Sequence, residues 1–305
     1  MKKKMIVLLT VVMLCTPLLS GVVYGYPQGG NEKIDPIVST NWLEENMDLE
    51  NLVIVDVRTS EEYEAGHISN SVNIPFVVPF SAWITMKDDL LLELPEDDEL
   101  FSMLGSFGIT EKSNVVLISG TSDPYAIAAA PRVADTLIYA GVKNVAILDG
   151  GYTKWAEEGR SIDTETPVIT EKEFDGKVNK KIFVSTEYVE RKIGKSVIID
   201  ARDENVYTGE VIEPYAEKPG HIETAVSLPA PLMWNEDGTY KDMDEIRQMV
   251  SSIADKNDHI IVYCGCGGYA SAWYFILTEA FGYKHVKFYD GSAQEWVKYN
   301  DMVLN

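Results

Sequence analysis

The sequence predicts an α/β protein made of two tandem copies of one domain, each with a mainly parallel sheet flanked by helices. Two observations lead to this prediction. Short apolar runs rich in β-branched residues alternate with helical stretches, and one ordered set of short sequences occurs twice along the chain. Parallel strands need long crossovers, which are usually helices, so the alternation favours parallel sheets. A length of 305 residues suits two domains of ordinary size.

Composition excludes several classes of protein. Hydrophobic residues make up 46% of the chain and charged residues 24%, values that argue against a disordered, collagenous or multi-span membrane protein. The 48 acidic residues outnumber the 26 basic ones and give a formal net charge of -22. Such a surface repels phosphate backbones, so we expect no nucleic acid partner. Three cysteines are too few for a disulfide scaffold.

Residues 1–25 have the pattern of a secretory signal peptide. Lysines at positions 2–4 precede a mostly apolar stretch over 5–23, and Gly25 offers a small residue for cleavage. We therefore expect an extracytoplasmic protein, whether secreted, periplasmic or at the cell surface. The alternative is an uncleaved membrane anchor, which Pro17 disfavours. No later segment is long and apolar enough to span a membrane, so we expect no span in the mature chain.

Five segments recur in the same order in the two halves. The matched pairs are 53–58 with 197–202, 66–68 with 220–222, 73–75 with 227–229, 116–120 with 260–264, and 148–155 with 289–296. The spacing from Asp56 to Gly120 equals that from Asp200 to Cys264, 64 residues. These repeats predict one domain over 35–160 and a second over 182–303. The polar stretch 161–181 between them is the predicted linker.

Each half contains one helical stretch that directly follows a central strand, at 126–140 and at 270–280. In open parallel sheets, ligands bind outside the carboxyl ends of the strands, at the turns that lead into helices. The two turns where we expect a site therefore follow Ile118 and Tyr263.

The turn after Tyr263 carries the candidate chemistry. Its residues are Cys264, Gly265, Cys266, Gly267, Gly268 and Tyr269. Glycines let backbone N–H groups turn inward, and N–H groups that converge at a helix start bind anions. Cys264 is the candidate nucleophile, and we expect its pKa to be lowered because the loop would stabilise the thiolate.

This loop and its flanking motifs resemble the rhodanese-like sulfurtransferase family in its tandem two-domain form. Both halves carry the family's Asp-x-Arg, Gly-His-Ile and Asp-Gly-x-x-x-x-Trp signatures. The resemblance implies that the Cys264 thiolate takes the outer sulfur of a small anionic donor such as thiosulfate, and that sulfite leaves. A thiol or cyanide then removes the sulfur from the resulting persulfide. The loop of six residues favours sulfur transfer over the related cell-division-cycle phosphatases, which have one residue more. No cofactor is implied, and four scattered histidines predict no metal site.

The first half departs from this pattern at the decisive position. Gly120 stands where Cys264 stands in the second half, and a glycine cannot be a nucleophile. Asp123 and Pro124 oppose anion binding, the first by its charge and the second by its missing N–H. We predict that the first domain is inactive, as is usual in tandem members of the family, and that it shapes a cleft with the second domain.

Substrate choice depends on residues that differ from the family pattern. Arg202 matches an arginine implicated in binding the anionic donor, and a purely structural ion pair is the equal alternative. Gly265 and Cys266 stand where thiosulfate-specific members often carry basic residues, and the Cys-Gly-x-Gly form resembles mercaptopyruvate-type members. Tyr269 departs from those members, which often have Thr or Ser there. We predict thiosulfate as the donor, with 3-mercaptopyruvate as the alternative.

Two further questions stay open in the sequence. Cys266 is either an incidental small residue, a resolving thiol, or the partner of Cys264 in a strained and easily reduced disulfide. The alternative to an enzyme is a non-catalytic rhodanese-like module that uses Cys264 and Cys266 as a redox sensor or sulfur carrier.

Overall fold

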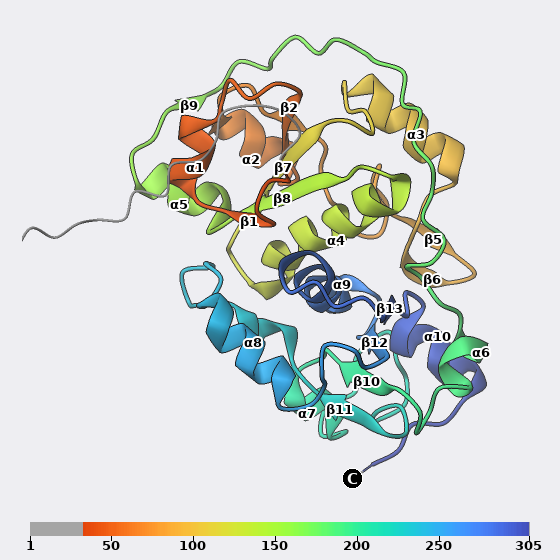
Figure 1. Ribbon diagram of the computed structural model, residues 1–305. Helices are drawn as coiled ribbons and strands as arrows, with labels where there is room; N and C mark the ends of the chain where they lie inside the picture. The colour runs from red at the N-terminus through yellow and green to blue at the C-terminus, as the bar shows by residue number, and fades with distance from the viewer. Residues whose placement is uncertain (1–32, 305) are drawn as a thin grey trace, which may run out of the picture. The chain divides into compact units, whose positions relative to one another are not determined.

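The structure, a computed structural model, describes residues 33–304 (Figure 1). The predicted signal peptide, residues 1–25, lies outside the described residues. Within 33–304, every helix is too short or too polar to cross a lipid bilayer.

The first half is built on a five-stranded sheet in which every neighbouring pair is parallel. In spatial order its strands are β1 (Ile37–Val38), β8 (Asn144–Leu148), β7 (Asn114–Ile118), β2 (Leu52–Asp56) and β4 (Val72–Asn73). Its helices are α1 (Thr40–Glu45), α2 (Ser60–Ala65), α3 (Asp97–Ser106), α4 (Pro124–Ala140) and α5 (Gly151–Glu157). Thr59 starts α2 with a capping box, in which it exchanges hydrogen bonds with Glu62.

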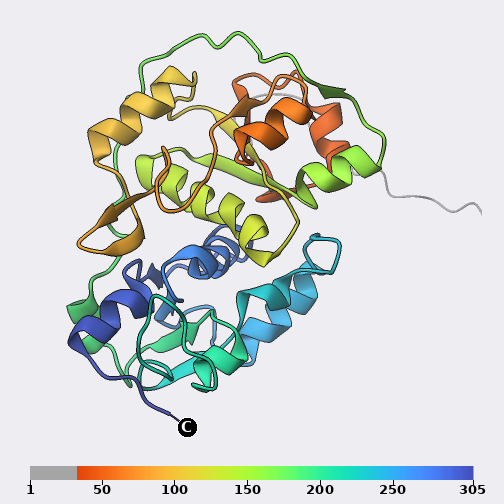
Figure 2. The same cartoon turned by 180° about the vertical axis from the view of Figure 1, so that it is seen from behind.

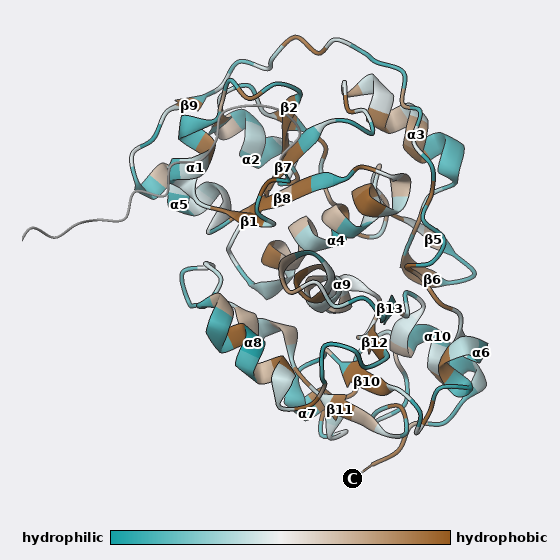
Figure 3. Cartoon of the chain, in the orientation of Figure 1, coloured by the Kyte–Doolittle hydropathy of each residue, from teal (hydrophilic) through white to brown (hydrophobic). Residues whose placement is uncertain are grey.

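Side chains alternate across the first sheet and so divide the helices between its faces. Val115 and Leu117 of β7 join the core cluster that contains residues of α3 and α4. Val116 and Ile118, one position on, face the opposite way and pack with α1 and α5. Figure 3 shows the same pattern, with apolar strands inside and hydrophilic outer surfaces on α3 and α8. The apolar runs read in the sequence are therefore strands buried on both faces.

The second half repeats this arrangement. Its parallel strands, in spatial order, are β11 (Ala225–Ser227), β10 (Val197–Asp200), β12 (Ile260–Tyr263) and β13 (Val286–Phe288). A parallel bridge from Phe183 to Phe288 extends the edge. Its helices are α6 (Thr186–Glu190), α7 (Glu204–Tyr207), α8 (Met243–Ser251), α9 (Gly268–Phe275) and α10 (Ser292–Tyr299), with a 3-10 turn at Ala230–Met233. The predicted helix over 270–280 is α9 followed by a π-helical turn, Ile276–Ala280.

Two small antiparallel pairs complete the first half. Strand β3 (His67–Ile68) pairs with β9 (Ile162–Asp163), and β5 (Thr85–Lys87) pairs with β6 (Leu90–Glu93) as a hairpin. After β9 the chain forms no helix or strand from 164 to 181, and it runs along the first half (green in Figures 1 and 2). It is held there by bonds such as that from the Lys172 N–H to the Gly105 carbonyl, 2.9 Å.

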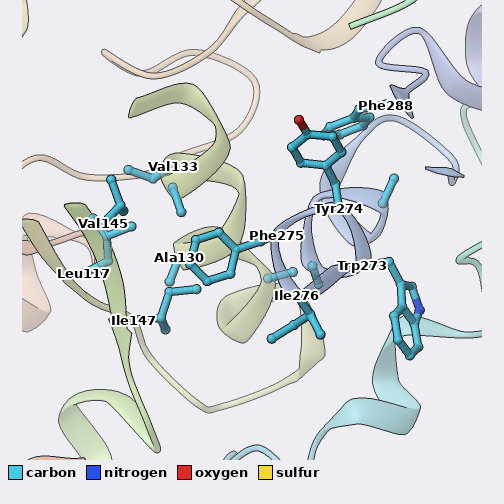
Figure 4. Close-up of a cluster of buried hydrophobic side chains, with 14 of the residues drawn as sticks. Leu117, Ala130, Val133, Val145, Ile147, Trp273, Tyr274, Phe275, Ile276 and Phe288 are labelled. Carbon is cyan, nitrogen blue, oxygen red and sulfur yellow. The ribbon is translucent and has the colours of Figure 1, made fainter. Parts of the chain in front are cut away.

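The two halves share one core where α4 meets α9. Figure 4 shows Phe275 beside Ala130, with Leu117 and Ile147 of the first sheet on the other side of Ala130. Helices α4 and α9 each begin in the last residues of the equivalent loop of their own repeat. Their contact therefore brings the two predicted turns, after Ile118 and after Tyr263, to the same region of the molecule.

Candidate active site

Cys264 follows the last residue of β12, at the carboxyl end of the strand. Its carbonyl accepts a hydrogen bond from the Ala293 N–H (2.9 Å), and the Gly265 carbonyl accepts one from the Gln294 N–H (3.0 Å). Both donors belong to the first turn of α10, whose N–H groups have no partners inside the helix. Because these carbonyls point toward α10, the N–H groups of the loop are free to point the other way.

The Cys264 sulfur receives those N–H groups. The Gly267 N–H donates to Sγ at 3.1 Å, and the N–H groups of Cys266 and Ala270 also stabilise the thiolate form. Gly267 has a φ of 97°, in the left-handed region that favours glycine, and a Cβ there would lie 2.8 Å from Asp290 Oδ1. The loop therefore has the inward-facing amides that its glycines predicted.

The expected lowering of the Cys264 pKa is wrong. Cys264 is only 3% exposed, and burial raises its pKa because a thiolate is poorly solvated there. The three N–H groups oppose that rise without cancelling it, and the Glu213 carboxylate adds to it. The sequence showed the amides but not the depth at which the sulfur lies.

Cys264 lines a cavity of about 300 Å³ to which both halves contribute. The second half supplies Glu213, Tyr215, Cys264, Gly265, Cys266, Gly268 and Tyr269, and the first supplies Phe76, Val78, Leu91, Leu92, Asp123, Tyr125, Ala126, Ala128 and Ala129. The nucleophile candidate thus faces a wall built largely from the half that lacks one. Small-molecule sites are commonly apolar cavities of this size with a few polar groups.

Two equivalent tyrosines meet in this wall. Tyr125 and Tyr269 occupy the same loop position in the two repeats, and their rings stack with centroids 4.7 Å apart and planes 12° apart. Tyr269 is 5% exposed, whereas Tyr125 is 58% exposed at the cavity's edge. Tyr269 therefore both lines the pocket and packs against its counterpart.

Arg202 is held by structural contacts. Its Nε and Nη2 donate to the Asp200 carboxylate, and Nη2 also donates to the Gly220 carbonyl at 2.8 Å. Arg58 makes the same bonds with Asp56 and the Gly66 carbonyl in the half without a nucleophile. Arg202 is buried and is not among the cavity-lining residues, so its predicted role in donor binding stays a prediction.

Glu213 is a lining residue that the sequence reasoning missed. Its side chain is 12% exposed, its Oε2 makes no hydrogen bond, and Arg202 Nη1 lies 3.7 Å from that oxygen. Burial raises the pKa of Glu213 to about 7, although Arg202 opposes the rise. The sequence does mark this region by an insertion in the second repeat. Tyr63 precedes Gly66 by 3 residues, whereas the equivalent Tyr207 precedes Gly220 by 13. Glu213 and Tyr215 lie in this insertion.

The loop of the first half binds its own carboxylate. Asp123 Oδ1 accepts hydrogen bonds from the N–H groups of Tyr125 (2.9 Å) and Ala126 (3.0 Å) and so caps α4. Ala126 is the counterpart of Ala270, whose N–H faces the sulfur in the second half. The anion site of the first repeat is thus already filled by the chain, which supports the prediction that this domain is inactive.

Arg132 of α4 lies directly behind the loop that holds Cys264. Its guanidinium donates to Asp290 from Nη1 (2.5 Å) and Nη2 (3.1 Å) and to the Leu92 carbonyl, and it is fully buried. Asp290 in turn lies against Gly267. Nothing in the repeat pattern pointed to Arg132, because its role arises only where the two halves meet.

Cys266 lines the cavity beside Cys264, and both thiols are free. Burial raises the pKa of Cys266, and the nearby Cys264 and Glu213 raise it further.

Comparisons with known proteins place the chain in a family. Residues 39–158 and 185–299 each match the rhodanese-like domain, so the chain belongs to that family and carries its domain twice. The matched ranges fall within the predicted domains 35–160 and 182–303. The predicted fold class is confirmed, and so is the enzyme class, since rhodanese-like domains are sulfurtransferases.

Named relatives share this two-domain length. A putative thiosulfate sulfurtransferase of Mycobacterium leprae is 28% identical over 278 residues, covering 88% of this chain and 96% of the relative. The sulfur carrier protein TtuD of Thermus thermophilus is 29% identical over 276 residues, covering 85% and 93%. Among solved structures, YnjE superposes with a TM-score of 0.76 at 25% identity, covering 88% of this chain and 68% of YnjE.

Proposed function

We propose that this protein moves a sulfane sulfur from thiosulfate or a similar donor to a thiophilic acceptor, with Cys264 as the carrier. The observation that supports this most directly is the Cys264 sulfur itself. It accepts the Gly267 N–H at a strand end and lines a cavity large enough for a small molecule. The names of the relatives agree with this chemistry.

In the first step, the Cys264 thiolate attacks the outer sulfur of thiosulfate. A sulfur–sulfur bond forms to Cys264, the donor's own sulfur–sulfur bond breaks, and sulfite leaves with the electron pair. In the second step the acceptor attacks the outer sulfur of this persulfide, and Cys264 departs as a thiolate. Sulfite leaves the first step as a stable anion, and the loop amides stabilise the Cys264 thiolate that leaves in the second, so neither leaving group needs a proton.

The test is the formation of thiocyanate from thiosulfate and cyanide by the wild type, Cys264→Ser and Cys266→Ser. We expect Cys264→Ser to abolish the reaction. A mass increase of one sulfur atom on the Cys264 peptide after thiosulfate treatment would identify the carrier. Thiocyanate formation retained by Cys264→Ser would overturn the proposal. Cys266→Ser is the matched control, and a loss of activity there would show that the second thiol takes part.

3-Mercaptopyruvate is the second candidate donor, which the Cys-Gly-x-Gly sequence of the loop favours. Relative turnover of the two donors decides between them. A carrier without turnover of its own is the remaining alternative, and the Thermus relative bears such a name. A Cys264 persulfide that forms but that no small acceptor discharges would favour this carrier role.

We also propose that the protein acts outside the cytoplasm, on the evidence of residues 1–25. Cell fractionation and the N-terminal sequence of the mature protein test this proposal. Recovery of the full-length chain in the cytoplasm would contradict it.

A further inference from the structure

We infer that the acceptor which discharges Cys264 is an organic thiol bearing a cationic ammonium group. This inference rests on the proposed function and names the class of its second substrate. Three features of the cavity carry it, namely the sign of its charged groups, a buried carboxylate oxygen that accepts no hydrogen bond, and an aromatic wall.

The charged side chains that line the cavity are both acidic. They are Asp123 from the first half and Glu213 from the second, and among the described residues no lysine or arginine lines the cavity. The nearby guanidinium groups are already engaged, because Arg202 pairs with Asp200 and, at 3.7 Å, with Glu213, and Arg132 pairs with Asp290. A chain with a net charge of -22 adds to the negative potential. These charges favour a cationic acceptor over an anionic one. The anionic donor meets the same charges, which the loop amides around the Cys264 sulfur offset.

Glu213 offers a hydrogen-bond acceptor that the protein leaves unused. Its Oε2 is buried and makes no hydrogen bond, and a Cβ on Gly265 would lie 2.6 Å from it. Glu213 thus lies against the loop that holds the sulfur. A buried carboxylate oxygen without a donor is costly, and the Arg202 guanidinium, 3.7 Å from Oε2, is shared with Asp200. An ammonium group supplies the hydrogen-bond donor that Oε2 lacks. An acceptor whose thiol and ammonium groups are joined by a short chain can therefore reach the Cys264 sulfur and Glu213 together.

The remaining wall suits the organic part of such a molecule. Tyr125, Tyr215 and Tyr269 contribute rings, and Phe76, Val78, Leu91 and Leu92 contribute apolar surface. Aromatic rings attract ammonium groups through their negative faces, more strongly where water is excluded. Alkylated ammonium groups suit this wall best, because they combine positive charge with apolar surface.

The transfer step needs no further reactant. The acceptor's thiolate attacks the outer sulfur of the Cys264 persulfide, a new sulfur–sulfur bond forms, and the bond to Cys264 breaks. The products are the acceptor's persulfide and the Cys264 thiolate.

Three thiols of different charge test the inference. Cys264 is first loaded with inorganic polysulfide, and the persulfide is then offered thiocholine (cationic), 2-mercaptoethanol (neutral) or mercaptoacetate (anionic). Loss of the extra sulfur mass gives a rate constant for each thiol. The three thiols differ in intrinsic reactivity, so their rate constants are not compared directly. For each protein, the rate constant for thiocholine is divided by that for mercaptoethanol, and this ratio is compared between a variant and the wild type.

We expect Glu213→Gln to lower this ratio about tenfold, as loss of a charge-assisted hydrogen bond predicts. Glu210→Gln is the matched control, since Glu210 is exposed in the same segment and does not line the cavity. An unchanged ratio in Glu213→Gln, or a mercaptoacetate to mercaptoethanol ratio that does not rise in this variant, would overturn the inference while leaving the proposed function intact.

Failure of Cys264 to hold sulfur would instead count against the proposed function. The cationic site is then tested alone by calorimetry with choline, which has no thiol. Binding of choline that Glu213→Gln abolishes supports the site, and absence of choline binding refutes it.

Discussion

At the scale of single residues, the Cys264 sulfur combines two opposing influences. Loop amides stabilise its thiolate, while burial and Glu213 favour the neutral thiol. Burial has the larger effect, so the pKa of Cys264 is raised. The sequence revealed the amides because glycines mark where they turn inward. It could not reveal the burial, because the other half builds much of the cavity wall that Cys264 faces.

A raised thiol pKa has a definite pH dependence. Below that pKa the thiolate fraction grows about tenfold per pH unit, so alkylation of Cys264 by neutral iodoacetamide should accelerate steadily from pH 6 to pH 9. Glu213→Gln removes a charge that raises the pKa, and we expect its profile to shift to lower pH. Alkylation rates followed by mass spectrometry in Cys266→Ser, to isolate one thiol, provide the measurement. A rate that levels off below pH 7 would contradict the raised pKa.

Gly267 is the residue on which the loop geometry depends most directly. An alanine there takes a left-handed conformation and meets Asp290 Oδ1 at 2.8 Å, so Gly267→Ala should lose about 1–2 kcal/mol of unfolding free energy from the backbone alone. It should also slow sulfur loading of Cys264. Urea denaturation and the loading rate give the two measurements.

Gly194→Ala separates the cost of the left-handed backbone from the cost of the contact with Asp290. Gly194 also has a positive φ (67°), but nothing lies within 4 Å of an added Cβ there. If both variants load sulfur as fast as the wild type, Gly267 does not set the loop's geometry.

At the scale of elements, α4 and α9 follow equivalent loops that use their N-terminal amides differently. Asp123 satisfies those of α4, whereas those of the second loop face Cys264. Both helices were predictable from apolar patterning after a strand. Glu213 was not singled out, because it lies in an insertion that has no counterpart in the first repeat.

This difference predicts that restoring the nucleophile to the first loop does not restore its chemistry. A Cβ at Gly120 meets nothing closer than 3.9 Å, so Gly120→Cys fits without a clash. In a Cys264→Ser background it should nevertheless hold no persulfide, since the Asp123 carboxylate occupies the amides that would stabilise one. Peptide mass after thiosulfate treatment decides this, and an extra sulfur atom on residue 120 would refute the explanation.

At the scale of the whole molecule, the two repeats share a core and a cavity. The matching segments of the two halves predicted the duplication, and the resemblance to tandem rhodanese-like proteins implied a cleft between the domains. The bond between Arg132 and Asp290 could not be predicted in this way. It joins residues 158 positions apart, and only the packing of α4 against the second half brings them together.

Breaking this pair should destabilise both halves. Arg132→Met leaves the Asp290 carboxylate without its cation, and removing one partner of a buried pair typically costs about 3–5 kcal/mol. Lys87→Met serves as a control, because Lys87 pairs with Glu96 within the first half, where both side chains are exposed and ion pairs contribute about 1 kcal/mol or less. Urea denaturation of both variants gives the comparison. Equal stability would mean that the buried pair does not hold the halves together.

The mixed origin of the cavity wall has a consequence for how this protein can change. The reacting sulfur and its amides belong to one repeat, while Tyr125, Leu91 and Leu92 belong to the other. Mutations in the repeat that lacks the cysteine can therefore change which molecules enter the cavity, without altering the atoms that exchange sulfur. The first repeat can thus vary in sequence and alter substrate selectivity while the second repeat keeps the reaction.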